Sequence, residues 1–323
     1  MRVIDKVLKN LNATLRQLNP IPKLFPLATF HTRTWAKFRY VYGPRLRISG
    51  AVPVERLENG NMLIALNRKT PLGNKGDLIA IPLDFTIYRK VLWNGFWEPK
   101  DCAFLAAGLE AARTNGSTRS LFIDIGAHCG MVTRQVLNMS DVSSDIVLFE
   151  PLLRHTEALE FNLRKFRGSH NIKIERVALS TSDGTTQFFT ELMNRGNSSV
   201  FKSVVRDAKY EVNDITLVNT SEYFSQHFRS YDHIVLKCDT QGLDVSILTR
   251  IPPEIWQNVY CAVVEVWALP EIQASEVDVM MSMFDGFKWM SWDPEGKTPI
   301  TTSELRDFWL SQSRKWGNVF LRR

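Results

Sequence analysis

The sequence predicts an α/β protein with a doubly wound, mostly parallel sheet of seven strands, preceded by a basic helical and small β extension. Two observations support this fold class. From about residue 85 onward, short apolar runs alternate with segments of helical spacing, which is typical of a sheet with helices on both faces. The first of these runs ends at Asp124 and enters a turn with Gly126 and Gly130, at the sheet edge where such folds bind ligands.

The amino-terminal extension, residues 1–83, differs in charge from the doubly wound domain expected at 84–323. Residues 1–47 hold ten Lys or Arg and one acidic residue, while the whole chain has a net charge of +6. The basicity is therefore local, and it gives no reason to expect a nucleic-acid partner. Apolar residues at helical spacing predict an amphipathic helix that ends before Pro20: Val3, Ile4, Val7, Leu8, Leu11, Leu15 and Leu18.

Three interpretations of this helix remain open. Its leucine face can pack on the body of the same protein or on a twin subunit of a homo-oligomer. The basic residues, with the aromatic side chains between residues 35 and 42, also suit a peripheral contact of residues 1–47 with an anionic membrane surface. A mitochondrial presequence is the third alternative. After the helix, residues 48–67 predict a small hairpin that turns at Asn59-Gly60.

The doubly wound domain is expected to contain a helix over 98–114 and another over 152–166. Seven apolar segments predict the strands of its sheet: 121–125, 145–150, 171–179, 232–239, 260–267, 286–292 and 318–323. Because helical segments separate most of these strands, the connections between them favour parallel pairing.

Cysteine usage bears on the cellular location. The four cysteines lie far apart, without CxxC or Cys/His spacing: Cys102, Cys129, Cys238 and Cys261. We therefore expect neither a disulfide framework nor a structural zinc site. A cytoplasmic protein is expected, placed on the inner face of the cell membrane if the basic segment binds lipid. No run of residues reaches the length of a membrane-spanning helix.

The turn after the first strand indicates the kind of ligand. It reads D-x-G-x-x-x-G, whereas a dinucleotide favours G-x-G-x-x-G, since a pyrophosphate needs free backbone amides. An acid at Asp124 repels a phosphate but suits a cationic amino group. Glu150 ends the next strand, twenty residues beyond Gly130, where a carboxylate can accept hydrogen bonds from a ribose diol. S-adenosyl-L-methionine has an amino group, a ribose and no phosphate, so we predict it as the cofactor.

Six blocks follow one another along the chain: "DIGAHCGMVT", "LFEP", "RVALSTSDGTTQFF", "GNSSV", "IVLKCDTQGLDVSIL" and "AVVEVW". In this order they resemble the FkbM family of class I S-adenosylmethionine-dependent methyltransferases. A further segment at 84–99 resembles the family's entry segment, so the resemblance covers about 84–323. The chain departs from the common family residues at His128, Gln241 and Asp244.

Together with the glycine turn, the resemblance gives a set of expected cofactor-binding residues: Glu98, Asp124, Gly126, His128, Gly130, Glu150, Pro151, Ala178 and Asp239. Two of them have a structural alternative. Glu98 can be a carboxylate at a helix start that the macrodipole stabilises, and His128 can shape its loop.

Three residues are the expected catalytic groups. Lys237 and Asp239 are two positions apart and therefore share one face of their strand, and Glu265 is near the end of the next strand. If the two carboxylates converge, one can have a raised pKa and serve as a base, or Asp239 and Glu265 can together hold a divalent cation such as Mg²⁺. The alternative is a structural role at the strand ends. His233, at the opposite end of its strand, is expected to be structural.

The family resemblance implies methylation of a hydroxyl group, often on a sugar. We therefore expect an O-methyltransferase that acts on a carbohydrate or glycolipid, as in cell-surface polysaccharide biosynthesis. Two alternatives are a methyltransferase of polyketide or other small-molecule alcohols, and a non-catalytic cofactor-binding protein recruited to a membrane or partner by its basic segment. A nucleic-acid methyltransferase is disfavoured, since "KCDTQG" lacks the Asn/Asp-Pro-Pro-aromatic arrangement that holds a flipped base. The glycine spacing disfavours a nicotinamide oxidoreductase.

Overall fold

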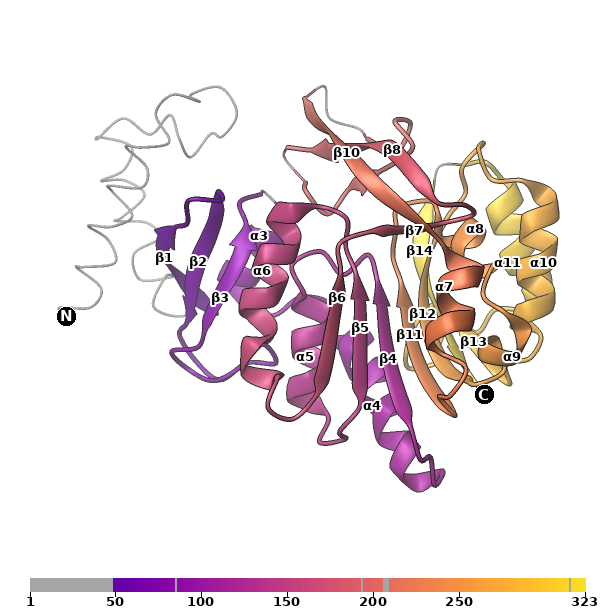
Figure 1. The fold of residues 1–323 in the computed structure, drawn as a ribbon, viewed down its shortest axis with the longest axis horizontal. Coiled ribbons are helices and arrows are strands. Elements are labelled where there is room, and N and C mark those ends of the chain that lie inside the picture. Colours follow the sequence, from indigo (N-terminus) through magenta and orange to yellow (C-terminus); the bar gives the residue numbers. More distant parts are fainter. Residues whose placement is uncertain (1–48, 85, 193, 206–208, 314) are drawn as a thin grey trace.

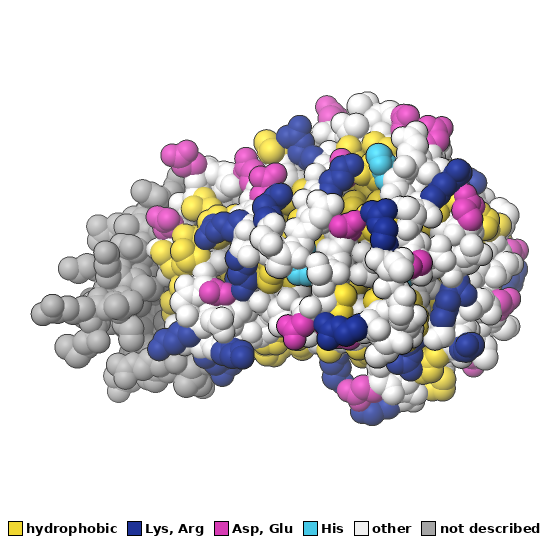
Figure 2. Space-filling view, turned by 60° about the horizontal axis from the view of Figure 1, so that its bottom comes forward, with side chains coloured by type: hydrophobic (Ala, Val, Ile, Leu, Met, Phe, Trp, Pro, Cys, Tyr) yellow, Lys and Arg dark blue, Asp and Glu magenta, His cyan; other side chains and the backbone are white. Residues whose placement is uncertain are grey.

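A computed structural model of the chain describes residues 49–84, 86–192, 194–205, 209–313 and 315–323. The predicted basic amphipathic helix and the rest of residues 1–47 lie outside the described residues. No helix in the described part is long and apolar enough to cross a bilayer. On the face shown in Figure 2, acidic and basic side chains lie interspersed over the described residues.

The body of the molecule is a seven-stranded sheet with the order β13-β14-β12-β11-β4-β5-β6 (Figure 1). The neighbours from β12 to β6 pair in parallel, and β14 runs antiparallel to both β12 and β13. The predicted doubly wound, mostly parallel sheet of seven strands is confirmed. Its strands are β4 (Ser120–Ile125), β5 (Asp145–Phe149), β6 (Asn171–Glu175), β11 (His233–Cys238), β12 (Val259–Trp267), β13 (Trp289–Ser291) and β14 (Trp316–Arg322).

Helices cover both faces of this sheet because its central strands are apolar on both faces. In β4, Leu121, Ile123 and Ile125 pack with the later helices: α7 (Thr220–His227), α8 (Asp244–Leu248), α9 (Pro253–Trp256), α10 (Ala274–Phe284) and α11 (Thr302–Leu310). Phe122 points to the other face, as the strand period of two requires. There it meets α4 (Pro99–Thr114), α5 (Met131–Met139) and α6 (Leu153–Leu163), which η1 (Arg164–Phe166) extends.

A three-stranded antiparallel sheet lies beside α6 (Figure 1). Its first two strands form the predicted hairpin, which turns at Gly60; the third was not predicted. The strands are β1 (Ala51–Arg56), β2 (Asn61–Leu66) and β3 (Leu78–Pro82), followed by α3 (Ile87–Asn94). The Asn162 side chain both donates to and accepts from the backbone of Ala80, at 2.7 and 2.8 Å, so α6 satisfies the edge of β3.

A second sheet of four strands lies over the carboxyl ends of the large sheet, in the order β7-β10-β8-β9 (Figure 1). The sequence predicted a single strand over 171–179, and this was wrong: the segment breaks after Glu175. Its second part leaves the large sheet and pairs in parallel with β10. The bounds are β7 (Ala178–Ser180), β8 (Gly184–Glu191), β9 (Ser198–Ser199) and β10 (Tyr210–Asn219). This second sheet covers the edge of the large sheet at which a ligand is expected.

Candidate active site

A cavity of about 350 Å³ opens at the carboxyl ends of the parallel strands, next to the switch in strand order beside β4. This volume falls in the range of small-molecule sites. Most of the predicted site residues line it: Glu98, Gly126, His128, Glu150, Pro151, Ala178, Lys237, Asp239 and Glu265. Asp124 and Gly130 are not among its lining residues.

The two glycines of the turn are needed for packing within the protein. Both have positive φ, 79° at Gly126 and 75° at Gly130. A Cβ at Gly126 would lie 1.9 Å from the carbonyl oxygen of Asp239, and one at Gly130 would lie 2.4 Å from Cδ1 of Leu159. The turn thus approaches the loop after β11 and the helix α6 more closely than any side chain allows. Gly130 was expected to let a ligand approach its backbone, but it faces Leu159 of α6 instead.

The amides of the turn are already used by the protein. The backbone N–H groups of Gly126 and Ala127 both donate to the carbonyl of Phe149 at 3.0 Å, and that of Gly130 donates to Ala127. The amide of His128 donates to Oε2 of Glu150 at 3.0 Å. A pyrophosphate needs such amides free, so this turn is not built as a phosphate cradle.

Glu150 is buried at one end of the cavity, and three donors hold it. Besides the amide of His128, its Oε1 accepts from the amide of Leu152 at 3.0 Å and lies 3.1 Å from Nδ1 of His155. Burial, together with Arg195 and Arg154, lowers the pKa of His155 to about 3, so the ring is neutral. Nδ1 therefore carries the proton that Glu150 accepts, and Nε2 is a bare acceptor.

Two histidine rings pack together and line this end of the cavity. The centroids of His128 and His155 are 4.0 Å apart. Within the described residues, neither Nε2 has a hydrogen-bond partner. Burial, the neighbouring ring and Lys237 lower the pKa of His128 as well, against the opposing pull of Glu150 and Asp239. His128 has φ of 50°, so it also shapes the turn, as the structural alternative proposed.

Asp124 holds a lysine instead of lining the cavity. It is fully buried, its Oδ2 accepts from Oγ1 of Thr133 at 2.5 Å, and its Oδ1 lies 3.5 Å from Nζ of Lys237. Register explains the contact, because Asp124 and Lys237 are direct neighbours on β4 and β11. The expected contact between Asp124 and a ligand's amino group is not what this arrangement provides.

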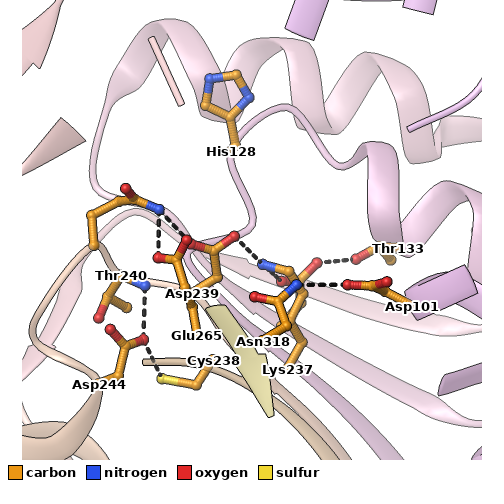
Figure 3. A network of polar contacts seen from close by, with 12 residues as sticks. Asp101, His128, Thr133, Lys237, Cys238, Asp239, Thr240, Asp244, Glu265 and Asn318 are labelled. Carbon is orange, nitrogen blue, oxygen red and sulfur yellow. Dashed lines mark hydrogen bonds and ion pairs between the residues drawn. The ribbon is translucent and has the colours of Figure 1, made fainter. Parts of the chain in front are cut away.

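Lys237 and Asp239 form an ion pair at the other end of the cavity, with Nζ 3.2 Å from Oδ2 (Figure 3). Burial alone would lower the pKa of Lys237, but Asp239, Asp124 and Glu98 outweigh it and raise the pKa. Burial would raise the pKa of Asp239, but Lys237 and hydrogen bonds outweigh it and lower the pKa. Lysine and aspartate are therefore both charged.

Glu265 converges on Asp239, as the sequence predicted for neighbouring strands. Its Oε2 accepts from Nε1 of Trp267 at 2.7 Å and from Nε2 of Gln241 at 2.6 Å. The same Gln241 nitrogen lies 2.8 Å from Oδ1 of Asp239. Burial, Asp239 and Asp244 raise the pKa of Glu265 well above its ordinary value, so the pair carries one proton.

Glu98 and Asp101 bring two more carboxyls to this end from the start of α4. The side chain of Glu98 makes no capping hydrogen bond, and burial followed by repulsion from Asp239 and Asp101 raises its pKa to about 7. Oδ2 of Asp101 accepts from the side-chain Nδ2 of Asn318 at 2.7 Å. Carboxyls thus outnumber the buried ammonium of Lys237 among the described residues here, and this end of the cavity suits a ligand that brings positive charge.

Backbone strain concentrates at the cavity. Among the described residues, four that are not glycine have positive φ: Glu98, His128, Gln241 and Gln312. The first three line the cavity, and Gln312 lies in an exposed loop. Such conformations cost free energy and are retained where the surrounding structure fixes them, commonly at functional sites.

The residues do not form a metal centre. In the part of the chain that the structure describes, no three His, Cys, Asp or Glu side chains gather with metal-binding geometry. Asp239 and Glu265 do converge, but the amide N–H groups of Gln241 lie between them, and Mg²⁺ requires oxygen ligands. The expected Mg²⁺ site is therefore unsupported by its donor set.

Sequence reasoning missed several residues of the site. Gln241 stood out only as a departure from the family residues, and His155 showed no pattern. Their contacts with Glu265 and Glu150 are seen only in the folded chain. Asp244 shapes the loop after β11 by accepting from the amides of Thr240 and Gly242, at 2.9 and 3.1 Å. His233 is structural, as expected: its Nε2 lies 2.8 Å from the carbonyl oxygen of Gly108.

No protein-family model matches the chain, and no curated protein matches it. Among solved structures it is similar to the SAM-dependent methyltransferase from Agrobacterium tumefaciens, with 9% identity, 90% of this chain and 79% of that chain covered, and a TM-score of 0.37. It is also similar to precorrin-6y C5,15-methyltransferase from Geobacter metallireducens, with 11% identity and a TM-score of 0.32. The match covers 68% of this chain and 88% of that chain. It is similar as well to ribosomal protein L11 methylase from Lactobacillus delbrueckii, with 10% identity and a TM-score of 0.32. The match covers 71% of this chain and 80% of that chain.

These values are low, so the fold assignment rests on the strand order itself. A mostly parallel seven-stranded sheet, with β14 antiparallel between β12 and β13, is a Rossmann-like fold of the class I methyltransferase type. Membership of the FkbM family stays a prediction.

Proposed function

We propose that this protein is an S-adenosyl-L-methionine-dependent O-methyltransferase that acts on a hydroxyl of a carbohydrate or glycolipid. One observation carries the proposal. The turn at the switch point has its amides committed to Phe149, Ala127 and Glu150, while carboxyls crowd the far end of the cavity around the ammonium of Lys237. This combination disfavours a phosphate-bearing nucleotide and favours a nucleoside that carries positive charge.

The cavity offers places for both ends of such a cofactor. We assign Glu150, Pro151 and Ala178, which line the cavity, to the ribose and base, and Glu98, which also lines it, to the amino-acid end. When bound, the cofactor supplies an electrophilic methyl group on a sulfonium. The protein then has to align an acceptor oxygen and remove its proton.

Asp239 is the proposed general base, since it lines the cavity and is ionised. Lys237 keeps it so, and Asp124 in turn fixes the ammonium of Lys237. Asp239 accepts the hydroxyl proton as the acceptor oxygen takes the methyl group.

Aromatic rings beside these groups support a sugar acceptor. Trp267 and Trp316 both line the cavity and stack, with centroids 6.0 Å apart and planes at 22°. Trp316 is 54% exposed although it is a large apolar side chain. An exposed ring next to carboxyls suits a ligand with C–H faces and hydroxyl edges, as a pyranose has.

Calorimetric titration tests the cofactor assignment. We expect S-adenosyl-L-methionine to bind and a nicotinamide dinucleotide not to bind. The reverse result would reject the proposal. Labelled cofactor with cell-envelope extracts then tests the acceptor, with label expected in the glycan or glycolipid fraction and lost on periodate or glycosidase treatment.

A membrane contact through residues 1–47 is proposed from the sequence alone. Deletion of residues 1–19 is expected to abolish binding to anionic liposomes. Unchanged binding would rule out this helix as the contact, and the homo-oligomer alternative is tested by light scattering of the same two proteins.

A further inference from the structure

The Gln241 side chain lies where two carboxyls meet. Its Nε2 is 2.8 Å from Oδ1 of Asp239 and 2.6 Å from Oε2 of Glu265. One amide nitrogen has two hydrogens, so it satisfies both acceptors at once. The orientation of the amide follows from these partners, because the reversed amide would present its oxygen to two carboxyl oxygens.

The backbone holds Gln241 in this place at a cost. Its φ is 57°, in the left-handed region that residues other than glycine rarely adopt. Its carbonyl accepts from Oγ of Ser199 at 2.8 Å, so the second sheet fixes the loop after β11. The neighbouring carboxyl of Asp244 binds the amides of Thr240 and Gly242 on either side.

Two further donors contact the pair. Nε1 of Trp267 donates to the same oxygen of Glu265 at 2.7 Å, and Nζ of Lys237 lies 3.2 Å from Oδ2 of Asp239. Two converging carboxyls usually need a cation or a proton between them. Here the Nε2 of Gln241, which coordinates no metal, lies between Oδ1 of Asp239 and Oε2 of Glu265.

We infer that Gln241 is a positioning residue that clamps Asp239 to Glu265 and replaces the divalent cation that such a carboxyl pair could otherwise bind. The clamp itself is independent of the proposed function. Its catalytic consequence rests on that function: methyl transfer proceeds without a divalent cation. In that step the S–CH₃ bond breaks, the O–CH₃ bond forms, the acceptor proton passes to Asp239, and the sulfonium charge is lost.

Metal binding by the full-length protein tests the clamp directly. Mn²⁺ alone is titrated and followed by electron paramagnetic resonance. We expect no bound Mn²⁺ in the cavity of the wild type, and at least tenfold tighter Mn²⁺ binding in Gln241→Glu, where a third carboxyl replaces the donor. Adding Glu265→Gln to that variant should abolish the gain.

Gln312→Glu is the matched control. Gln312 is also in the left-handed region, with φ of 47°, but it is exposed and away from the cavity. The same change of charge there should leave Mn²⁺ binding as in the wild type. Wild-type Mn²⁺ binding that Asp239→Asn or Glu265→Gln removes would overturn the inference, as would equal Mn²⁺ binding by the two Gln→Glu variants.

Gln241→Met, similar in length and without donors, keeps the test informative if Gln241→Glu unfolds. Loss of the clamp should lower kcat at least tenfold with little change in KM, whereas a merely structural role would change both. Wild-type methyl transfer should be unchanged by EDTA, and transfer by Gln241→Glu should depend on added Mn²⁺ or Mg²⁺. Inhibition of the wild type by EDTA would contradict the inference, while absence of any methyl transfer would contradict the proposed function and leave the Mn²⁺ result standing.

Discussion

The two ends of the cavity hold their acidic groups by different means. At the Glu150 end, the carboxylate is held by the backbone amides of His128 and Leu152 and by one neutral ring. At the Asp239 end, the partners are all side chains: Lys237 and Gln241, each two positions from Asp239, and Glu265 and Trp267 of β12. The first end is a backbone-built receptor with little freedom. The second is a cluster of charged and polar side chains, and the charge state of each depends on the others. Single substitutions should therefore change this end more than the first end.

The largest effect is expected for Asp239→Asn at the second end. Loss of a general base should lower kcat about 100- to 10,000-fold, which is roughly 3–5 kcal/mol of barrier, with cofactor affinity changed far less. Methyl-transfer kinetics and calorimetry check both parts. Asp214→Asn, an exposed aspartate on β10, is the matched control and should keep full activity. Equal activity of the two variants would remove Asp239 from the chemistry.

Lys237→Met should come next. The change leaves the buried carboxylate of Asp124 and the half-buried carboxylate of Asp239 without their cation. Removing one member of a buried pair, here Lys237 beside Asp124, costs on the order of 3–5 kcal/mol. Urea unfolding of the variant measures the loss. The exposed Lys288→Met should change the free energy of unfolding by roughly 0.5 kcal/mol or less. A stable Lys237→Met would mean that the carboxyls already share protons and need no ammonium.

At the first end, Gly126→Ala should be destabilising through the backbone. The new Cβ meets the carbonyl oxygen of Asp239 at 1.9 Å, and φ of 79° adds strain, so about 2–4 kcal/mol of stability is expected to be lost. Gly116→Ala separates the two causes, because its φ is 69° but nothing lies within 4 Å of the new Cβ. That control should lose only about 1–2 kcal/mol in the same urea assay.

The smallest expected effect is a change in the pH dependence of folding stability in His155→Gln. The pKa of His155 is about 3 in the folded protein against an ordinary value of 6.5, so below pH 6.5 the unfolded chain binds more protons. Stability therefore falls as the pH falls from 6.5 toward 3, by roughly 2 kcal/mol at pH 5 from this residue. A glutamine side chain cannot titrate, so chemical unfolding at pH 7 and pH 5 should show a smaller difference in the variant. An unchanged difference would mean that His155 is protonated in the folded protein.

The comparison also explains which parts of the site could be predicted. Glu150 ends an apolar strand and lies twenty residues beyond Gly130 in the sequence, and it lines the cavity. The convergence of Asp239 and Glu265 was predictable as well, because both end neighbouring strands. Asp124 was assigned to a ligand, yet the strand register turns it toward Lys237. Gln241 stood out only as a departure from a family pattern. Nothing in the residues around it indicates that its side chain joins two carboxyls.

The seven-stranded doubly wound fold, the glycine turn and the first hairpin could all be predicted from the amino-acid sequence. They follow from apolar periodicity and from backbone conformations that only certain residues adopt, and both are local properties of the chain. Three other features emerged only from the folded chain: β7 leaves the large sheet to join β10, Asn162 satisfies the edge of β3, and Gln241 rather than a cation joins Asp239 to Glu265. Each of these is a contact between separate elements, and its energy depends on distance and burial that no single segment encodes.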